Sequence, residues 1–254
     1  MIIRERDVEV GDFNTELSLK FGKHEEIYKN AIYFDLEHYV YKKPKCVGVF
    51  GACYYDEKTN VIKVTQYMIE NKSEAKDVLY LAKKYFIDVC ANKKKKYIVT
   101  FSGNNDFTVI NFLFEKYGIN FNFSDYFTSV DIQKVYESTF KKGVGLKALE
   151  KKFGIIREGE LISGSNLAKT FHKVLKDKEY FKRMPKEKIE KILIYNEQDV
   201  VNLFHILVGW NAIIEIERKE ALRLAEEKRL LEEKTLELND IEKNNNFINN
   251  EDKH

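Results

Sequence analysis

The run Ile32-Tyr33-Phe34-Asp35-Leu36-Glu37 most constrains how this chain folds. An apolar, β-branched and aromatic run predicts a buried strand, over residues 31–37. Side chains alternate faces along a strand, so Asp35 and Glu37 point the same way, about 7 Å apart. Two carboxylates on a covered face repel each other and lose solvation, and a cation such as Mg²⁺ relieves both costs. The alternative is a strand end that frays into solvent with two unrelated acids.

Strand and helix signals alternate along the chain in an order that predicts an α/β sheet. An antiparallel hairpin is expected on one side of the sheet and parallel strands beyond it. Residues 1–30 are mixed and polar, and their pattern predicts no particular element. Further strands are expected over 46–55, 61–69, 97–101 and 127–131, and helices over 73–90, 106–117, 132–140, 146–153, 166–175 and 185–209.

Charge divides the chain into a mildly basic body and an acidic tail. Residues 1–211 carry 35 basic and 29 acidic side chains, and residues 212–254 carry 8 basic and 12 acidic ones. A basic body is compatible with a nucleic-acid partner. Residues 212–243 lack Gly and Pro and repeat Leu every seven residues, which predicts a charged helix that either packs on the body or forms a homodimer. Residues 244–254 are polar and predict a disordered tail.

The cysteines and the hydropathy pattern indicate the cellular compartment in which the protein is expected. Cys46, Cys53 and Cys90 are odd in number and lack metal-type spacing, so we expect reduced thiols in a cytoplasmic protein. No apolar run approaches membrane-spanning length, and the charged first ten residues do not resemble a secretory signal. We therefore expect no membrane partner.

Further carboxylates follow at positions where ligand-binding groups collect. Asp106 falls where a strand ends and a helix begins, which borders the ligand crevice of open α/β sheets. A helix N-cap role explains Asp106 equally well. In the helix over 185–209, Tyr195 and Asp199 lie four residues apart at the edge of an apolar face. An acid and a phenol at such an edge both need polar partners.

Three segments resemble the motifs of the DEDD 3′–5′ exonucleases: Phe34–Glu37, Gly103–Asp106 and Tyr195–Asp199. The tyrosine four residues before the last aspartate resembles the tyrosine-type subgroup (DEDDy, DnaQ-like). The connecting sequence, including Gly145–Glu150, is similar to the YprB-type predicted RNase H-like domain. The resemblance covers residues 30–210 and implies an RNase H-like α/β fold, with a mixed central sheet and flanking helices.

The resemblance also implies an activity, the hydrolysis of phosphodiester bonds of DNA or RNA by a 3′–5′ exonuclease. Two Mg²⁺ or Mn²⁺ ions about 4 Å apart would stabilise the attacking and leaving oxygens. Tyr195 would orient the attacking water, because a phenol with a pKa near 10 is a poor base at neutral pH. The residues implied to hold the ions are Asp35, Glu37, Asp106 and Asp199.

Two other hypotheses remain open at the level of sequence. One is an RNase H-like module that binds nucleic acid with little or no hydrolysis, and the other is a small-molecule α/β protein whose acids are caps. Asn104 and Lys147 are candidates for contacts with nucleic acid, and Asp131 is expected to be a structural cap. No pair of aromatic residues on a predicted strand indicates base stacking. Divalent-metal binding would separate these hypotheses.

Overall fold

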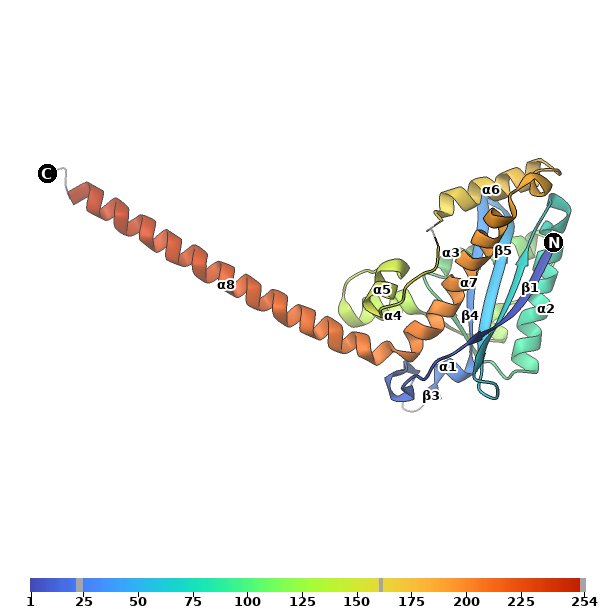
Figure 1. Cartoon of the computed structure of the whole chain (residues 1–254), viewed down its shortest axis with the longest axis horizontal. Coiled ribbons are helices and arrows are strands. Elements are labelled where there is room, and N and C mark those ends of the chain that lie inside the picture. Colours follow the sequence, from blue (N-terminus) through green and yellow to red (C-terminus); the bar gives the residue numbers. More distant parts are fainter. Residues whose placement is uncertain (22–24, 160–161, 252–254) are drawn as a thin grey trace. The chain divides into compact units, whose positions relative to one another are not determined.

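The structure, a computed structural model, describes residues 1–21, 25–159 and 162–251. The chain divides into two units, residues 1–211 and residues 212–254. The first unit holds the sheet and the helices that surround it (Figure 1).

A mixed sheet of six strands forms the centre of the first unit, in the order β1-β6-β5-β4-β7-β8. β1, β6, β5 and β4 pair antiparallel, whereas β4, β7 and β8 pair parallel. This sheet confirms the α/β class and the hairpin-plus-parallel order expected from the sequence. The strands are β1 (Ile2–Glu9), β4 (Ala31–Tyr41), β5 (Lys43–Asp56), β6 (Val61–Met68), β7 (Tyr97–Thr100) and β8 (Thr128–Asp131), with a separate short pair β2 (Lys20–Phe21) and β3 (Glu25–Glu26).

The six helices expected in the first unit are present at or near their expected positions, and the short helix at residues 27–30 was not expected. The bounds are α1 (Ile27–Asn30), α2 (Asp77–Ala91), α3 (Asn104–Lys116), α4 (Ile132–Phe140), α5 (Leu146–Lys152), α6 (Gly164–Lys176) and α7 (Lys186–Val208). Single 3-10 turns occur at η1 (Thr15–Leu17), η2 (Lys72–Ala75), η3 (Phe123–Asp125) and η4 (Phe181–Arg183). Pro185, where the sequence predicted this helix to begin, stands at the N-cap of α7.

β1 is an element that the sequence pattern did not predict. It pairs with β6 over its whole length and forms one edge of the sheet. Its charged side chains obscured the strand signal, as is common at sheet edges. Two of them reach α7, because Arg4 and Arg6 form ion pairs with Glu190 and Glu197.

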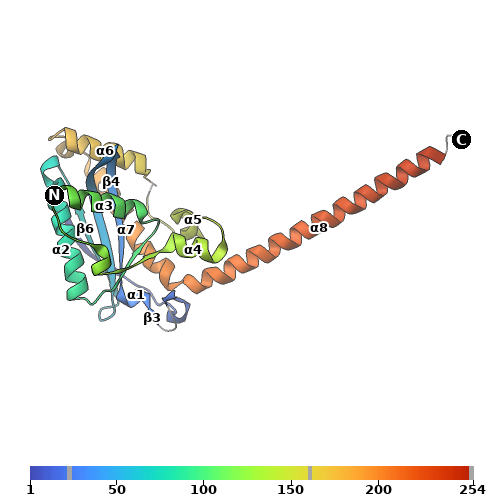
Figure 2. The ribbon, with the colours of Figure 1, turned by 180° about the vertical axis from the view of Figure 1, so that it is seen from behind.

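The two faces of the sheet are covered by different helices (Figures 1 and 2). The Phe34 ring packs against Phe86 of α2, with ring centroids 5.4 Å apart. The neighbouring Tyr33 ring packs against Phe204 of α7, with centroids 5.8 Å apart. This alternation places Asp35 and Glu37 on the face covered by α7. β4 also continues four residues beyond the predicted end, to Tyr41.

The described residues of the second unit, 212–251, belong to the long helix α8 (Trp210–Glu251). No Gly or Pro interrupts these residues, and the helix continues through 244–251. The sequence predicted a disordered tail over 244–254, of which residues 252–254 lie outside the described residues. The side chains of Leu224, Leu231 and Leu238 are exposed. Among the described residues, no single helix has the length and apolar character of a membrane span, and one bent pair, α7 with residues 210–238, meets these criteria by length and composition only.

Candidate metal centre

Three carboxylates meet where β4 lies beneath α7. Asp35 and Glu37 come from adjacent same-face positions of β4, and Asp199 comes from α7. One carboxylate oxygen of each lies within 4.8 Å of the others. This arrangement matches the oxygen ligands and spacing that a hard divalent cation requires. The structure thus brings together three of the four acids that the sequence singled out.

Asp106 lies beside this cluster and is not a helix cap. α3 begins at Asn104 with Gly103 as its N-cap, which makes Asp106 a buried residue of the first helical turn. The backbone N–H groups of Asp106 and of Leu36, in β4, favour its charged form and act to lower its pKa. The charges of Asp35 and Asp199 act on it directly. The N-cap alternative is therefore wrong, and Asp106 is close enough to Asp35 and Asp199 for their charges to raise its pKa.

The pKa values of Asp35, Glu37 and Asp106 are raised, because these acids are buried and close to one another. Burial and then the charge of Asp199 raise the pKa of Asp35 to about 7. Burial, followed by the charges of Asp35, Asp199 and Asp106, raises the pKa of Glu37 well above its ordinary value. Burial and then the charge of Asp35 do the same to the pKa of Asp106. Desolvated carboxylates that repel one another favour either protonation or a bound cation.

Asn196 connects the cluster to the sheet. Its Nδ2 donates to Asp35 Oδ2 at 3.0 Å, and its Oδ1 accepts from Gln66 Nε2 at 2.8 Å. Gln66 Nε2 also donates to the carbonyl of Leu193, at 2.8 Å. Asp35, Gly51 and Gln66 are opposite one another on three adjacent strands. The side chain of Asn196 lies over Gly51, where a Cβ would be 2.0 Å from Asn196 Oδ1.

Two basic side chains contact Asp199. Lys147 Nζ donates to Asp199 Oδ1 at 2.6 Å, and Arg157 donates to the same oxygen. Arg157 also forms a two-bond pair with Glu150, whose carboxylate accepts a further bond from Asn202 Nδ2 at 3.0 Å. The Arg157 side chain is only 7% exposed. These contacts orient Asp199 and offset part of the negative charge of the cluster.

Tyr195 lies under these two cations, at the edge of α7 that the sequence predicted. Lys147 Nζ is 4.6 Å from the ring centroid and the Arg157 guanidinium carbon is 5.4 Å from it. Burial and then the charges of Asp199 and Glu37 raise the pKa of Tyr195. The phenol therefore keeps its proton at neutral pH and can orient a water molecule but cannot act as a base.

The remaining predicted residues have simpler surroundings. Asn104 is exposed and accepts a hydrogen bond from Lys134 Nζ at 3.0 Å. Asp131 caps α4 by accepting from Gln133 N at 3.0 Å, which confirms its structural role. Ser102 N also donates to Asp131, at 3.0 Å. Asp131 thus supports the turn that leads into α3 and Asp106.

Sequence reasoning missed Asn196, Gln66 and Arg157. Asn196 could have been found, because helical spacing places it three residues before Asp199 on the same side of α7. Gln66 and Arg157 give no such signal. The first reaches the site only through strand pairing, and the second only through the loop after α5.

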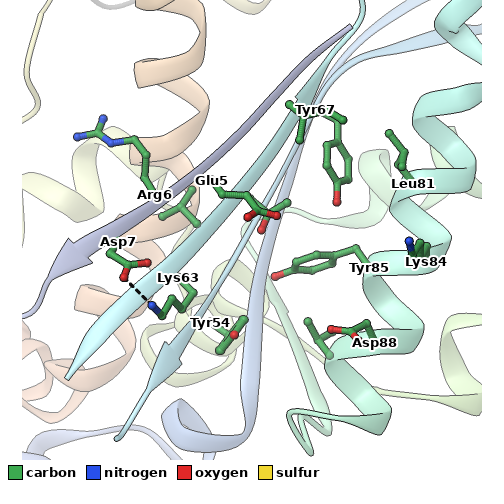
Figure 3. Close-up of a pocket in the computed structure, with 14 residues that line it drawn as sticks. Glu5, Arg6, Asp7, Tyr54, Lys63, Tyr67, Leu81, Lys84, Tyr85 and Asp88 are labelled. Carbon is green, nitrogen blue, oxygen red and sulfur yellow. Dashed lines mark hydrogen bonds and ion pairs between the residues drawn. The ribbon is translucent and has the colours of Figure 1, made fainter. Parts of the chain in front are cut away.

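A cavity of about 570 Å³ lies elsewhere, on the opposite side of the sheet. Figure 3 shows it between the strands β1 and β6 and the helix α2. Tyr67 and Tyr85 line its inner part, and the ion pair between Lys63 and Asp7, at 2.5 Å, lies at one side. None of the seven predicted site residues borders it.

Comparison with known proteins identifies the family. A family model described as the RNase_H superfamily matches residues 32–211. The match begins three residues before Asp35 and includes the four acids and Tyr195. No curated protein and no solved structure matches the chain. The match covers most of the chain and all of the described site, and the chain therefore belongs to the RNase H superfamily.

Proposed function

We propose that this protein is a metal-dependent nuclease that hydrolyses phosphodiester bonds of DNA or RNA. The observation that carries the proposal is the cluster of Asp35, Glu37 and Asp199, whose oxygens lie within 4.8 Å of one another. The resemblance of the three motifs to DEDD exonucleases supports a 3′–5′ exonuclease. Membership of the RNase H superfamily supports a nuclease in general.

The side chains of the site would have different roles in hydrolysis. Asp35, Glu37 and Asp199 would hold divalent ions, with Asp106 as the fourth ligand group. Bound Mg²⁺ or Mn²⁺ neutralises the scissile phosphate and makes water a usable nucleophile at neutral pH. The phenol of Tyr195 orients the attacking water, because its raised pKa keeps the hydroxyl protonated.

The surrounding residues keep this geometry in place. Asn196 fixes the rotamer of Asp35 by its 3.0 Å hydrogen bond, and Arg157 fixes that of Asp199. Residues that hydrogen-bond to the metal ligands, as these do, affect both the metal affinity and the orientation of the ligands. Lys147 is partly exposed, so its ammonium group is free to move from Asp199 to a substrate phosphate.

One observation favours a second candidate, an RNase H-like module that binds nucleic acid without hydrolysis. Lys147 and Arg157 both donate to Asp199 Oδ1 and so satisfy an oxygen that a metal ligand must offer. In a pure binding module these cations would replace the metal permanently. In a nuclease, the ammonium group of Lys147 must move away from Asp199 Oδ1 when metal binds.

A degradation assay separates the two candidates. Linear and circular DNA and RNA, with labels at either end, are incubated with wild-type protein and Mg²⁺ or Mn²⁺. We expect stepwise loss from 3′ ends, no products in EDTA, and intact circular substrates. Asp35→Asn and Glu37→Gln should abolish hydrolysis, because each removes one charge from a shared ion without leaving a cavity.

The matched control is Glu187→Gln, which removes an exposed carboxylate from the first turn of α7. It should degrade substrate at the wild-type rate. Activity within a few-fold of wild type in Asp35→Asn would refute the metal assignment. Wild-type protein that binds nucleic acid yet hydrolyses none under any metal would favour the binding module.

A further inference from the structure

A groove of about 660 Å³ lies at the end of the sheet where β4 turns into β5. Its walls come from β4 and β5, from the C-terminal end of α3, from η2 and from α6. The groove is separate from the cavity of Figure 3. We name it the hairpin groove, and the residues used to define it are Tyr39, Tyr41, Lys45, Lys116, Tyr117 and His172.

The hairpin groove is positively charged without compensation. Lys45, Lys72, Lys116 and Lys176 line it, and none of the described lining residues is acidic. In the part of the chain that the structure describes, none of these four lysines forms an ion pair. Lys116 Nζ lies 5.0 Å from the centroid of the Tyr117 ring, in a cation–π contact that leaves its charge unneutralised. Four ammonium groups without an acidic partner around one groove favour a polyanion over a neutral or cationic ligand.

Aromatic rings stand between these charges. Tyr41 is 60% exposed at the rim, while Tyr39 and Tyr117 are half-buried in the walls. Tyr39 is held by a 2.6 Å hydrogen bond between its hydroxyl and His172 Nδ1. Rings beside lysines offer stacking faces for bases and charges for phosphates, the combination by which proteins bind single strands.

Two irregularities of β5 shape the groove. The register between β4 and β5 skips Gly48 and then Lys45, so each is an extra residue on β5. A bulge of this kind re-aims a side chain, and it brings Lys45 to the wall of the groove. At Gly48, the ring of Phe171 lies 2.3 Å from where a Cβ would be. α6 therefore approaches the sheet closely enough for His172 to reach Tyr39.

Two tyrosines of the groove lie on the same strand as two acids of the metal centre. β4 keeps its alternation through both irregularities, because the extra residues are on β5. Tyr39 and Tyr41 therefore follow Asp35 and Glu37 on one face of one strand. Tyr41 is four residues beyond Glu37, about 13 Å along β4. A chain bound from the acids to Tyr41 would be an oligonucleotide and not a mononucleotide.

We propose that the hairpin groove binds single-stranded nucleic acid, with bases stacked on its tyrosines and phosphates at its lysines, and directs the strand to the metal centre. This inference rests on the proposed nuclease function for the direction of the strand. It assigns the substrate class as single-stranded, because bases within a duplex present no free face to Tyr41.

Binding is measured in EDTA, so that hydrolysis does not interfere. Fluorescence anisotropy follows a labelled thymidine oligonucleotide of about 12 nucleotides, within the usual range of single-strand sites. The double variant Lys116→Ala with Lys176→Ala removes two exposed lysines. We expect it to reduce the slope of log affinity against log salt by about 1.4, at about 0.7 per lost phosphate contact.

Tyr41→Ala should weaken binding about 5-fold or more, the lower end of the effect of losing one stacked base. Tyr41→Phe keeps the ring and should keep wild-type affinity. The control for charge is Lys93→Ala, an exposed lysine after α2 that does not line the groove. It should retain the wild-type salt slope. Thermal unfolding of each variant checks that the fold is intact.

The outcomes separate this inference from the proposed function. If both Tyr41→Ala and the double lysine variant keep the wild-type affinity and salt slope, the proposed binding role of the hairpin groove is refuted, even if the protein is a nuclease. Failure of the wild type to bind the oligonucleotide would overturn it as well. Binding that depends on the groove, in a protein that hydrolyses nothing with Mg²⁺ or Mn²⁺, would support the groove and refute the nuclease.

Discussion

Asn196 donates a 3.0 Å hydrogen bond to Asp35, and the two residues are 161 positions apart in the chain. The amide is in turn fixed by Gln66, at 2.8 Å, and both partners are buried. The orientation of a predicted metal ligand on β4 thus depends on an amide of α7 and on a side chain of β6.

This relationship predicts the effect of removing the amide. Asn196→Ala leaves the Asp35 carboxylate without its donor, so metal affinity should fall about 10- to 100-fold, the usual effect of losing a group that orients a ligand. The free energy of unfolding should fall by about 1–3 kcal/mol, because Gln66 loses one buried acceptor. Calorimetric titration with Mn²⁺ and chemical unfolding measure the two effects. Unchanged metal affinity would show that Asp35 does not need Asn196.

Gly51→Ala tests the same contact without removing a polar group. The new methyl group would stand 2.0 Å from Asn196 Oδ1, so the amide must move away from Asp35. We expect lower metal affinity and a loss of stability of about 1–3 kcal/mol from overpacking. Gly11→Ala is the control, since no heavy atom lies within 4 Å of a Cβ at that position. Equal metal affinity in the two glycine variants would contradict the prediction.

Lys147 is predicted to compete with metal for Asp199. Lys147→Met removes the ammonium group 2.6 Å from Asp199 Oδ1. In the absence of nucleic acid we expect metal affinity to rise by up to about 5-fold, the scale of a partly exposed ion pair. Lys151→Met, one turn further along α5 and exposed, should leave it unchanged. A lower metal affinity in Lys147→Met would mean that Lys147 supports the metal site.

The raised pKa of Asp35 predicts how the metal-free protein responds to pH. The folded state holds this proton more tightly than the unfolded chain, since burial and Asp199 raise the pKa to about 7. The resulting contribution to stability is complete below about pH 4 and is lost as pH rises through about 7. In EDTA, the melting temperature should therefore fall from pH 5 to pH 8 relative to Asp35→Asn.

Comparison with Asp35→Asn separates the acid cluster from the histidines. Because the charge of Asp35 also raises the pKa of Glu37 and of Asp106, the difference reports on the cluster as a whole. Burial lowers the pKa of His38 and of His205, and these histidines destabilise the fold as pH falls, in both proteins alike. Millimolar Mg²⁺ should raise the melting temperature of the wild type more at pH 8 than at pH 5, because the ion binds the ionised carboxylates. An equal effect of Mg²⁺ at both values would show that the acids do not form one metal site.

The sequence predicted those parts of the fold whose signal is local. Asp35 and Glu37 were placed on one strand face by alternation, and Tyr195 and Asp199 on one helix edge by the 3.6-residue period. β1 was missed, because its charges serve ion pairs with α7 and conceal the strand pattern. The strand of Asp35 was ended too early, at Glu37, and the pair Tyr39 and Tyr41 was therefore not recognised as lying on a strand.

The contacts around the acids could not be predicted in the same way. Gln66 and Asn196 meet across 130 positions through strand pairing and helix packing, neither of which a local pattern contains. Arg157 comes from a loop, where no periodicity fixes the direction of a side chain. The acids carry a recognisable spacing because they share elements, whereas the residues that orient them are brought together only by the complete fold.

Tyr195 and Asp199 lie one turn apart on α7, and their substitutions should have different effects on metal affinity and hydrolysis. Asp199 is proposed to bind metal, so Asp199→Asn should reduce both metal affinity and hydrolysis below detection. It should also cost about 1–3 kcal/mol of stability, because Arg157 and Lys147 lose a charged partner. Tyr195→Phe keeps the ring that lies 4.6 Å from Lys147 Nζ, so metal affinity and folding should be unchanged.

Only the hydroxyl is lost in Tyr195→Phe, and with it the group proposed to orient water. The rate of hydrolysis should fall by roughly 10²-fold, the scale of one lost proton-handling or orienting group. Metal affinity by calorimetry and single-turnover rates, measured for both variants under the same conditions, provide the comparison. A Tyr195→Phe protein as fast as wild type would make Tyr195 a packing residue for the two cations above it, and the hydrolytic chemistry would then depend on the four acids without it.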